Sequence, residues 1–313
     1  MRAHESSISG GEMSGKGITY GSDQVNCRLV GGWIPVVLHI IASIAVVLFA
    51  LGSSQLRTAY AQSQAVVDVD VQLVLAVDIS LSMDSDEQRL QREGYVAAFK
   101  DPALVQAILA GRHKRIAVTY FEWAGEFAVR TLIPWTIVDS AESAYSLSES
   151  LAAMPFSRAR FTSISGALNY ASGQFEESPF RSDRRVLDIS GDGPNNNGPP
   201  VSEARQALLD KGVVINGLPI VIKRGSPYFE LSDLEQYYRD CVIGGEGAFV
   251  IPIRSLDEFL SATRLKLLRE IAEPLDRDGP IIRVGSFQEV GTTDCLIGEK
   301  LLQRYLFDRF ENR

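Results

Sequence analysis

Histidine is scarce in this sequence of 313 residues. The three histidines are His4, His39 and His113, and the first two precede residue 62. A single histidine in the remainder cannot build a multi-histidine zinc site. His113 stands beside Lys114 and Arg115 before a predicted strand, and the segment ISGDG at 189–193 is not the G-x-S-x-G motif, which argues against a serine hydrolase. Any chemistry of this protein must therefore rest on hydroxyl and carboxylate groups.

Cysteine is equally rare, with Cys27, Cys241 and Cys295 as the only three. None of them stands in a C-x-x-C pair, which excludes zinc-ribbon and iron–sulfur sites. Cys241 and Cys295 can pair as a disulfide or remain two buried thiols, because spacing alone gives no geometry. The formal net charge of −8 argues against binding of nucleic acid, which needs clustered lysine and arginine.

The N-terminal part of the chain has little hydrophobic periodicity until one long apolar run. Residues 1–32 are rich in glycine and serine, and we expect them to be disordered. Residues 33–51 carry no charge and are long enough to span a bilayer. A signal peptide or membrane anchor is therefore predicted over residues 33–61.

Two interpretations of this segment remain open. The small residues Ala59 and Ala61 fit a signal-peptidase site, with a mature chain that begins near Gln62. Without cleavage, the same segment attaches the protein to the membrane. Either way we expect an exported protein, periplasmic or membrane-anchored, with its folded part outside the cytoplasm.

Strand and helix patterns alternate from residue 66 to residue 272. Such alternation predicts an α/β domain over residues 66–272, with a doubly wound, mostly parallel sheet and helices on both faces. The alternating pattern that follows Gly125 predicts one antiparallel edge strand. The expected strands are 66–78, 115–121, 127–133, 185–190, 213–222 and 248–253, and the expected helices are 84–99, 140–153, 163–176, 201–211, 231–239 and 256–271.

Oxygen-bearing side chains follow two of these strands and begin one helix. Asp78, Ser80 and Ser82 form a D-x-S-x-S motif after the first strand, and Asp192 follows the strand at 185–190. Thr162 stands at the start of the helix at 163–176. Doubly wound sheets place their ligand sites at the carboxyl ends of the strands, so these five side chains can meet there.

These motifs resemble those of the von Willebrand factor type A domain, over about residues 68–272. The resemblance rests on DISLS at 78–82, FTSISGAL at 161–168 and LDISGDG at 187–193. It implies a metal-ion-dependent adhesion site in which Ser80, Ser82 and Thr162 supply hydroxyl ligands. In that site Asp78 and Asp192 bind directly or through water. The chain looks most like an uncharacterised bacterial branch of exported proteins with this domain.

Hydroxyl and carboxylate oxygens suit a hard cation, and we expect Mg²⁺, with Mn²⁺ or Ca²⁺ as alternatives. The resemblance implies a binding module without enzymatic activity, which captures an acidic group of a protein partner. The membrane is a second partner if the N-terminal segment stays uncleaved. The alternatives are a metal-dependent hydrolase that uses the same acidic cluster and a metal-free scaffold of the same fold.

Several further features carry no assigned role. Asp188 shares the side of its strand with Ser190 and Asp192, and it can either hydrogen-bond into the site or face a polar helix. Asp68 and Asp70 precede an apolar strand instead of following it, which argues against an aspartyl-phosphate phosphatase. Residues 273–313 form a C-terminal extension that the resemblance does not cover. Its apolar residues at 301, 302, 305, 306 and 310 predict one face of a short helix.

Overall fold

The structure is a computed structural model, and it describes residues 66–222, 231, 233–272 and 293–311. The expected disordered region at 1–32 and the signal or anchor segment at 33–61 lie outside these residues. Within the described ranges, no helix has the length and apolar character needed to cross a bilayer.

Five strands form the central sheet, in the order β4-β3-β2-β6-β7. β2, β3, β6 and β7 run parallel, whereas β4 pairs antiparallel with β3 at one edge. This arrangement confirms the predicted doubly wound α/β fold with an antiparallel edge strand. The strands are β2 (Gln72–Asp78), β3 (Ile116–Trp123), β4 (Val129–Val138), β6 (Arg185–Gly191) and β7 (Val213–Pro219).

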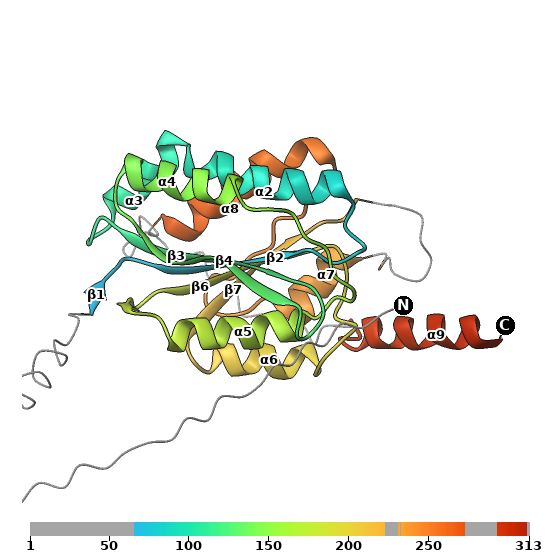
Figure 1. Cartoon of the computed structure of the whole chain (residues 1–313). Helices are drawn as coiled ribbons and strands as arrows, with labels where there is room; N and C mark the ends of the chain where they lie inside the picture. The colour runs from blue at the N-terminus through green and yellow to red at the C-terminus, as the bar shows by residue number, and fades with distance from the viewer. Residues whose placement is uncertain (1–65, 223–230, 232, 273–292, 312–313) are drawn as a thin grey trace, which may run out of the picture. The chain divides into compact units, whose positions relative to one another are not determined.

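Helices cover both faces of the sheet (Figure 1). One face carries α2 (Ser85–Phe99), α3 (Pro102–Ala110), α4 (Ala141–Ala152) and α8 (Phe259–Ile271). The other carries α5 (Ile164–Glu176), α6 (Val201–Leu209) and α7 (Leu234–Tyr237), which continues into the π-helical turn η1 (Tyr238–Val242). Every residue of β2 and β3 is buried, as expected for central strands that are covered on both sides.

Two predicted strands differ from the observed structure in more than their bounds. The strand expected at 66–78 is two strands, because β1 (Val67–Asp68) leaves the main sheet and pairs with β5 (Phe180–Arg181). The strand expected at 248–253 is wrong: this segment forms only isolated bridges to β7 and its end, at Val250 and Ile253. Pro252 stands between those two residues and has no amide hydrogen for a regular ladder.

Local sequence signals explain where several helices begin. Asp84 caps α2 and forms a capping box with Glu87. Asp101 caps α3, and Pro102 occupies its first position. The helix α3 was not among the predicted helices. The closing helix expected at 256–271 begins as a 3₁₀ turn, η2 (Leu256–Glu258), before α8. The capping residues fix where α2 and α3 begin.

The C-terminal extension contains the predicted helix, α9 (Ile297–Glu311). A disulfide joins Cys241 of η1 to Cys295, two residues before this helix. The structure thereby decides a question that the spacing of the cysteines left open.

Candidate metal centre

The first loop of the candidate centre starts at the carboxyl end of β2. Asp78 is fully buried, and its Oδ1 atom accepts a hydrogen bond of 2.6 Å from the amide of Ser80. Its Oδ2 atom is also buried and has no hydrogen-bond partner among the described residues. A buried carboxylate oxygen without a partner is costly, and a nearby cation would offset that cost.

Two serine hydroxyls connect this loop with the loop after β6. The Oγ atoms of Ser80 and Ser82 lie 2.8 Å apart, and the Ser82 hydroxyl donates to Asp192 Oδ1 at 2.7 Å. Ser80 Oγ lies 3.5 Å from the same oxygen. These contacts arise because β2 and β6 are adjacent parallel strands, so their carboxyl ends bring residues about 110 positions apart together.

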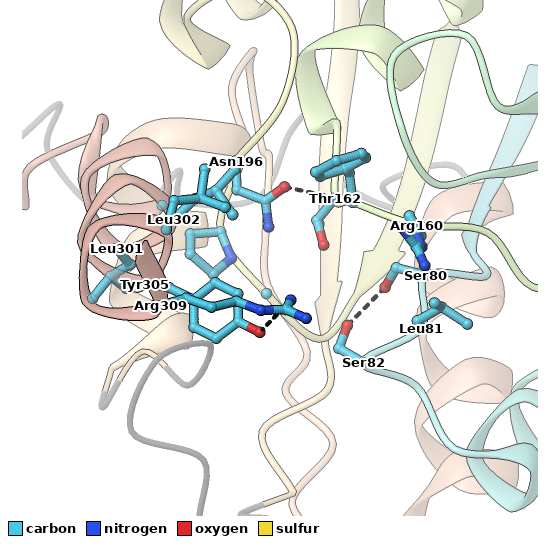
Figure 2. Close-up of a pocket in the computed structure, with 15 residues that line it drawn as sticks. Ser80, Leu81, Ser82, Arg160, Thr162, Asn196, Leu301, Leu302, Tyr305 and Arg309 are labelled. Atoms are coloured by element: carbon cyan, nitrogen blue, oxygen red, sulfur yellow. Dashed lines mark hydrogen bonds between the residues drawn. The ribbon is translucent and has the colours of Figure 1, made fainter. Parts of the chain in front are cut away.

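Thr162 reaches the same region from the loop before α5. It is buried and lines one cavity together with Ser80 and Ser82 (Figure 2). A Cβ added to Gly193 would lie 3.8 Å from Thr162 Oγ1, so this hydroxyl faces the chain next to Asp192. The structure therefore brings together all five side chains of the predicted site.

A run of three asparagines, 195–197, joins the loop after β6 to the loop before α5 that carries Thr162. Asn196 Oδ1 accepts from the Thr162 amide at 2.9 Å, and the Asn196 amide donates to the Thr162 carbonyl at 2.8 Å. Asn195 Oδ1 accepts from the Ser165 amide at 2.9 Å. The run stood out in the sequence, but its role as the support of Thr162 needs the three-dimensional contacts.

Arg158 joins the loop before α5 to the loop after β2, a role that no motif in the sequence indicates. Its guanidinium donates to the carbonyl of Leu81 at 2.9 Å and to that of Met83. Both carbonyls belong to the segment that carries Ser82. Nothing in the sequence pattern marks Arg158, because its partners are backbone atoms more than 70 positions away.

A buried ion pair stabilises the start of the loop between α4 and α5, which carries Thr162. Glu122 of β3 pairs with Arg92 of α2, and both side chains are almost fully buried. Arg92 also donates to the Met154 carbonyl at 2.5 Å. Glu122 accepts in addition from Arg130 of β4 at 3.1 Å. This network fixes the path of the chain on its way from α4 to Thr162.

Burial shapes the acidity of both carboxyl groups. Burial raises the pKa of Asp192 to about 6. Burial and the nearby charge of Asp192 raise the pKa of Asp78 well above its usual value. Two carboxylates that are both disfavoured in their charged form are stabilised by a cation between them.

The donor set fits a hard divalent cation. It offers three hydroxyl oxygens and two carboxyl groups, and oxygen ligands of this kind are those that Mg²⁺ prefers. The space beside Asp78 is kept by Gly191, where a Cβ would lie 2.9 Å from Asp78 Oδ2 and 2.9 Å from the Tyr238 hydroxyl. In the described part of the chain, no group of three or more histidine, cysteine, aspartate or glutamate side chains is placed so that it could hold a metal ion.

The match to a family model covers residues 68–275, and the family is described as "Protein of unknown function (DUF1194)". The chain belongs to the DUF1194 family. No curated protein matches the chain in sequence.

Solved structures similar to this DUF1194 chain include von Willebrand factor A domains. Proximal thread matrix protein 1 from the mussel byssus, solved "with zinc occupied MIDAS motif", is 17% identical, with a TM-score of 0.47 over 65% of this chain and 49% of that one. The chain thus spans about half the length of the mussel protein. A von Willebrand factor type A protein from Catenulispora acidiphila is 14% identical, with a TM-score of 0.47 over 65% and 43% of the two chains.

A third similar structure is the vWF domain of the type V pili tip protein Mfa5 from Porphyromonas gingivalis. It is 10% identical, with a TM-score of 0.44 over 67% of the DUF1194 chain and 99% of the other.

The structure also decides between the two alternatives for Asp188 of this DUF1194 domain. Asp188 lies 2.7 Å from the amino group of Lys266 on α8, so it faces a helix and not the candidate metal centre. Asp68 and Asp70 have structural partners as well: Asp68 pairs with Arg181, and Asp70 accepts from the amide of His113.

Proposed function

We propose that this DUF1194 protein is an extracytoplasmic, metal-dependent binding module. Ser80, Ser82 and Thr162 hold Mg²⁺ together with Asp78 and Asp192, and the ion captures an acidic group of a protein partner. The observation that carries this proposal is the buried, unpartnered Oδ2 atom of Asp78 beside hydroxyls that converge on Asp192.

The bound ion supplies positive charge at the mouth of a cavity. Three of the five ligands are neutral hydroxyls, so the ion keeps much of its attraction for a further anion. Ser80, Ser82 and Thr162 all line that cavity, which gives an incoming carboxylate access to the centre. The role of the chain is to orient the oxygens and to hold the three loops in place through Arg158 and Asn196.

Binding is favoured over catalysis by the chemistry of the cavity walls. The described residues that line it carry hydroxyl, amide, arginine and apolar side chains, and none of them is a histidine, lysine, aspartate or glutamate that could serve as a separate proton acceptor. The hydrolase alternative would need such a group, or a metal-bound water, beside the scissile bond.

An extracytoplasmic location is supported by the disulfide between Cys241 and Cys295. Disulfides persist in oxidising compartments and are rare in the cytosol. N-terminal sequencing of the exported chain distinguishes a periplasmic from a membrane-attached protein. An intact segment 33–51 would exclude cleavage and favour attachment to the membrane.

Calorimetric titration with Mg²⁺ and Mn²⁺ tests the metal centre. We expect one site per chain in the unaltered protein and no measurable binding in Asp78→Ala, because this change removes a carboxylate at the base of the site. Asp86→Ala is the matched control, since Asp86 is an exposed aspartate on α2 whose loss should leave metal binding unchanged. Equal metal binding in Asp78→Ala and the unaltered protein would exclude the proposed centre.

Saturation-transfer NMR tests capture of an acidic group, because it detects weak ligands. The probes are acetyl-Gly-Asp-Gly-amide and its asparagine counterpart, each with Mg²⁺ or with EDTA. We expect a signal only for the aspartate peptide and only with Mg²⁺. A signal that ignores EDTA would contradict metal-dependent capture, and turnover of phosphoesters that is lost in Asp78→Ala would favour the hydrolase.

A further inference from the structure

Helix α9 forms one wall of the cavity in front of the candidate metal centre. The cavity has a volume of about 430 Å³, and α9 contributes Gly298, Leu301, Leu302, Tyr305, Leu306 and Arg309. Figure 2 shows Tyr305 and Arg309 extending from this helix toward the loops that carry Ser80, Ser82 and Thr162. This helix follows the residues matched by the family model, which end at 275.

The start of α9 is firmly attached to the domain. The disulfide from Cys241 ends at Cys295, whose carbonyl also accepts from the Tyr237 hydroxyl at 3.4 Å. Asn195 Nδ2 donates to Glu299 Oε1 at 2.8 Å. Asn195 belongs to the same asparagine run that supports Thr162. The run therefore contacts both α9 and the loop that carries Thr162.

Two arginines border the cavity without a carboxylate partner. In the described part of the chain, neither Arg160 nor Arg309 forms an ion pair, and Arg309 contacts only the Tyr305 hydroxyl, at 3.3 Å. Both side chains are exposed. An unpaired guanidinium beside a metal-bound carboxylate can donate to it, and charge-assisted hydrogen bonds of this kind are among the stronger ones.

Much of the remaining lining is apolar. Leu301, Leu302 and Leu306 come from α9, while Phe161 and Leu81 flank the metal loops and remain about half exposed. A carboxylate group alone would leave this apolar area uncovered. A ligand that carries an apolar group beside its carboxylate would bury it and gain affinity.

We propose that α9 converts the metal site into a composite pocket for an acidic residue flanked by apolar residues in a protein segment. The metal ion and Arg309 bind the carboxylate, and Leu302 with its neighbours binds the flanking apolar side chain. This inference rests on the proposed function. A volume of about 430 Å³ lies in the range of ligand pockets, which suits a short protruding segment better than a flat protein surface.

Peptide selectivity in the unaltered, full-length protein tests the composite pocket. The probes are acetyl-Leu-Asp-Leu-amide, acetyl-Gly-Asp-Gly-amide and acetyl-Leu-Asn-Leu-amide, titrated by NMR with Mg²⁺. We expect the Leu-Asp-Leu peptide to bind about tenfold more tightly than the Gly-Asp-Gly peptide, and the asparagine peptide not to bind. Equal affinities of the two aspartate peptides would overturn the composite pocket and leave the proposed function intact. Failure of both to bind would overturn the two together.

Variants on α9 assign the selectivity to particular residues. Leu302→Ser should reduce the preference for leucine to about twofold without changing affinity for Gly-Asp-Gly, because that residue contacts only the apolar flank. Arg309→Gln should weaken both aspartate peptides about fivefold. The matched controls are Phe307→Ser and Arg304→Gln, which lie on the same helix, are exposed and do not line the cavity. If Leu302→Ser and Arg309→Gln both kept the full preference for the Leu-Asp-Leu peptide and its full affinity, the peptide would bind to another surface.

Discussion

Gly298 at the start of α9 lies against the backbone of Asn195. A Cβ at Gly298 would be only 2.0 Å from the Asn195 carbonyl oxygen, far inside any van der Waals contact. The helix can therefore reach the asparagine run only because residue 298 has no side chain. Since that run also supports Thr162, one glycine sets the distance between the C-terminal helix and the candidate metal centre.

Gly298→Ala should push the start of α9 away from the domain. We expect the free energy of unfolding to fall by about 1–3 kcal/mol, because the added methyl group meets backbone that cannot rotate aside. Gly173→Ala on α5 is the control, since a Cβ there meets nothing within 4 Å and should stabilise the helix by about 0.5–1 kcal/mol. Chemical denaturation measures both. Faster trypsin cleavage at Arg304 in Gly298→Ala would report detachment of α9, and unchanged stability would contradict the tight contact.

Asp78→Asn should separate the stability of the protein from its metal binding. Asparagine keeps the oxygen that accepts from the Ser80 amide and cannot ionise, so the metal-free variant should be more stable by about 1 kcal/mol at a pH at which Asp78 carries its charge. Mg²⁺ at about 100 times its dissociation constant should stabilise the unaltered protein by about 2.7 kcal/mol and the variant hardly at all. Thermal melts with Mg²⁺ and with EDTA measure the difference. A variant that Mg²⁺ stabilises as strongly as the unaltered protein would contradict a role of Asp78 in the site.

Arg92→Met should be strongly destabilising, whereas Arg89→Met on the same helix should not. Arg92 pairs with the buried Glu122, and its loss leaves that carboxylate with only the more exposed Arg130. Breaking a buried pair from one side costs about 3–5 kcal/mol, while the exposed pair of Arg89 with Glu93 is worth at most about 0.5 kcal/mol. Urea unfolding of both variants compares the two costs, and losses of equal size would contradict this assignment.

The buried carboxyl of Glu270 should make stability depend on pH. Burial raises its pKa from 4.5 to about 7, against the opposing effect of Lys266. The folded state therefore holds this proton more tightly than the unfolded state. The resulting stabilisation is complete below about pH 4.5 and is lost as the pH rises to about 7. Asp188, Tyr95 and Asn216 also face this group.

Glu270→Gln removes that titration and leaves Lys266 paired with Asp188. Relative to the unaltered protein, we expect the variant to gain of order 1–3 kcal/mol in unfolding free energy between pH 5 and pH 8. Metal-free protein in EDTA isolates this effect from the metal centre. Parallel stability curves for the two proteins across this range would mean that Glu270 keeps an ordinary pKa.

The regular elements of the domain could be predicted because their signals are local. The apolar run that ends at Asp78, the capping residue Asp84 and the alternation in β4 each reflect contacts within a few residues of chain. One strand prediction was wrong because a local breaker was overlooked. The segment 248–253 has strand-like composition, yet Pro252 and the edge of β7 leave it only isolated bridges.

By itself the sequence predicted the doubly wound fold, and its resemblance to a known domain named the five oxygen-bearing side chains of the candidate site. The approach of Asp78, Ser80 and Ser82 to Asp192 follows from the topology, because β2 and β6 are adjacent parallel strands that end at the same edge of the sheet. Only the tertiary structure decided that Cys241 pairs with Cys295, that Asp188 turns to Lys266, and that α9 forms a wall of the cavity. These features depend on contacts between segments far apart in the chain, which no local pattern of residues records.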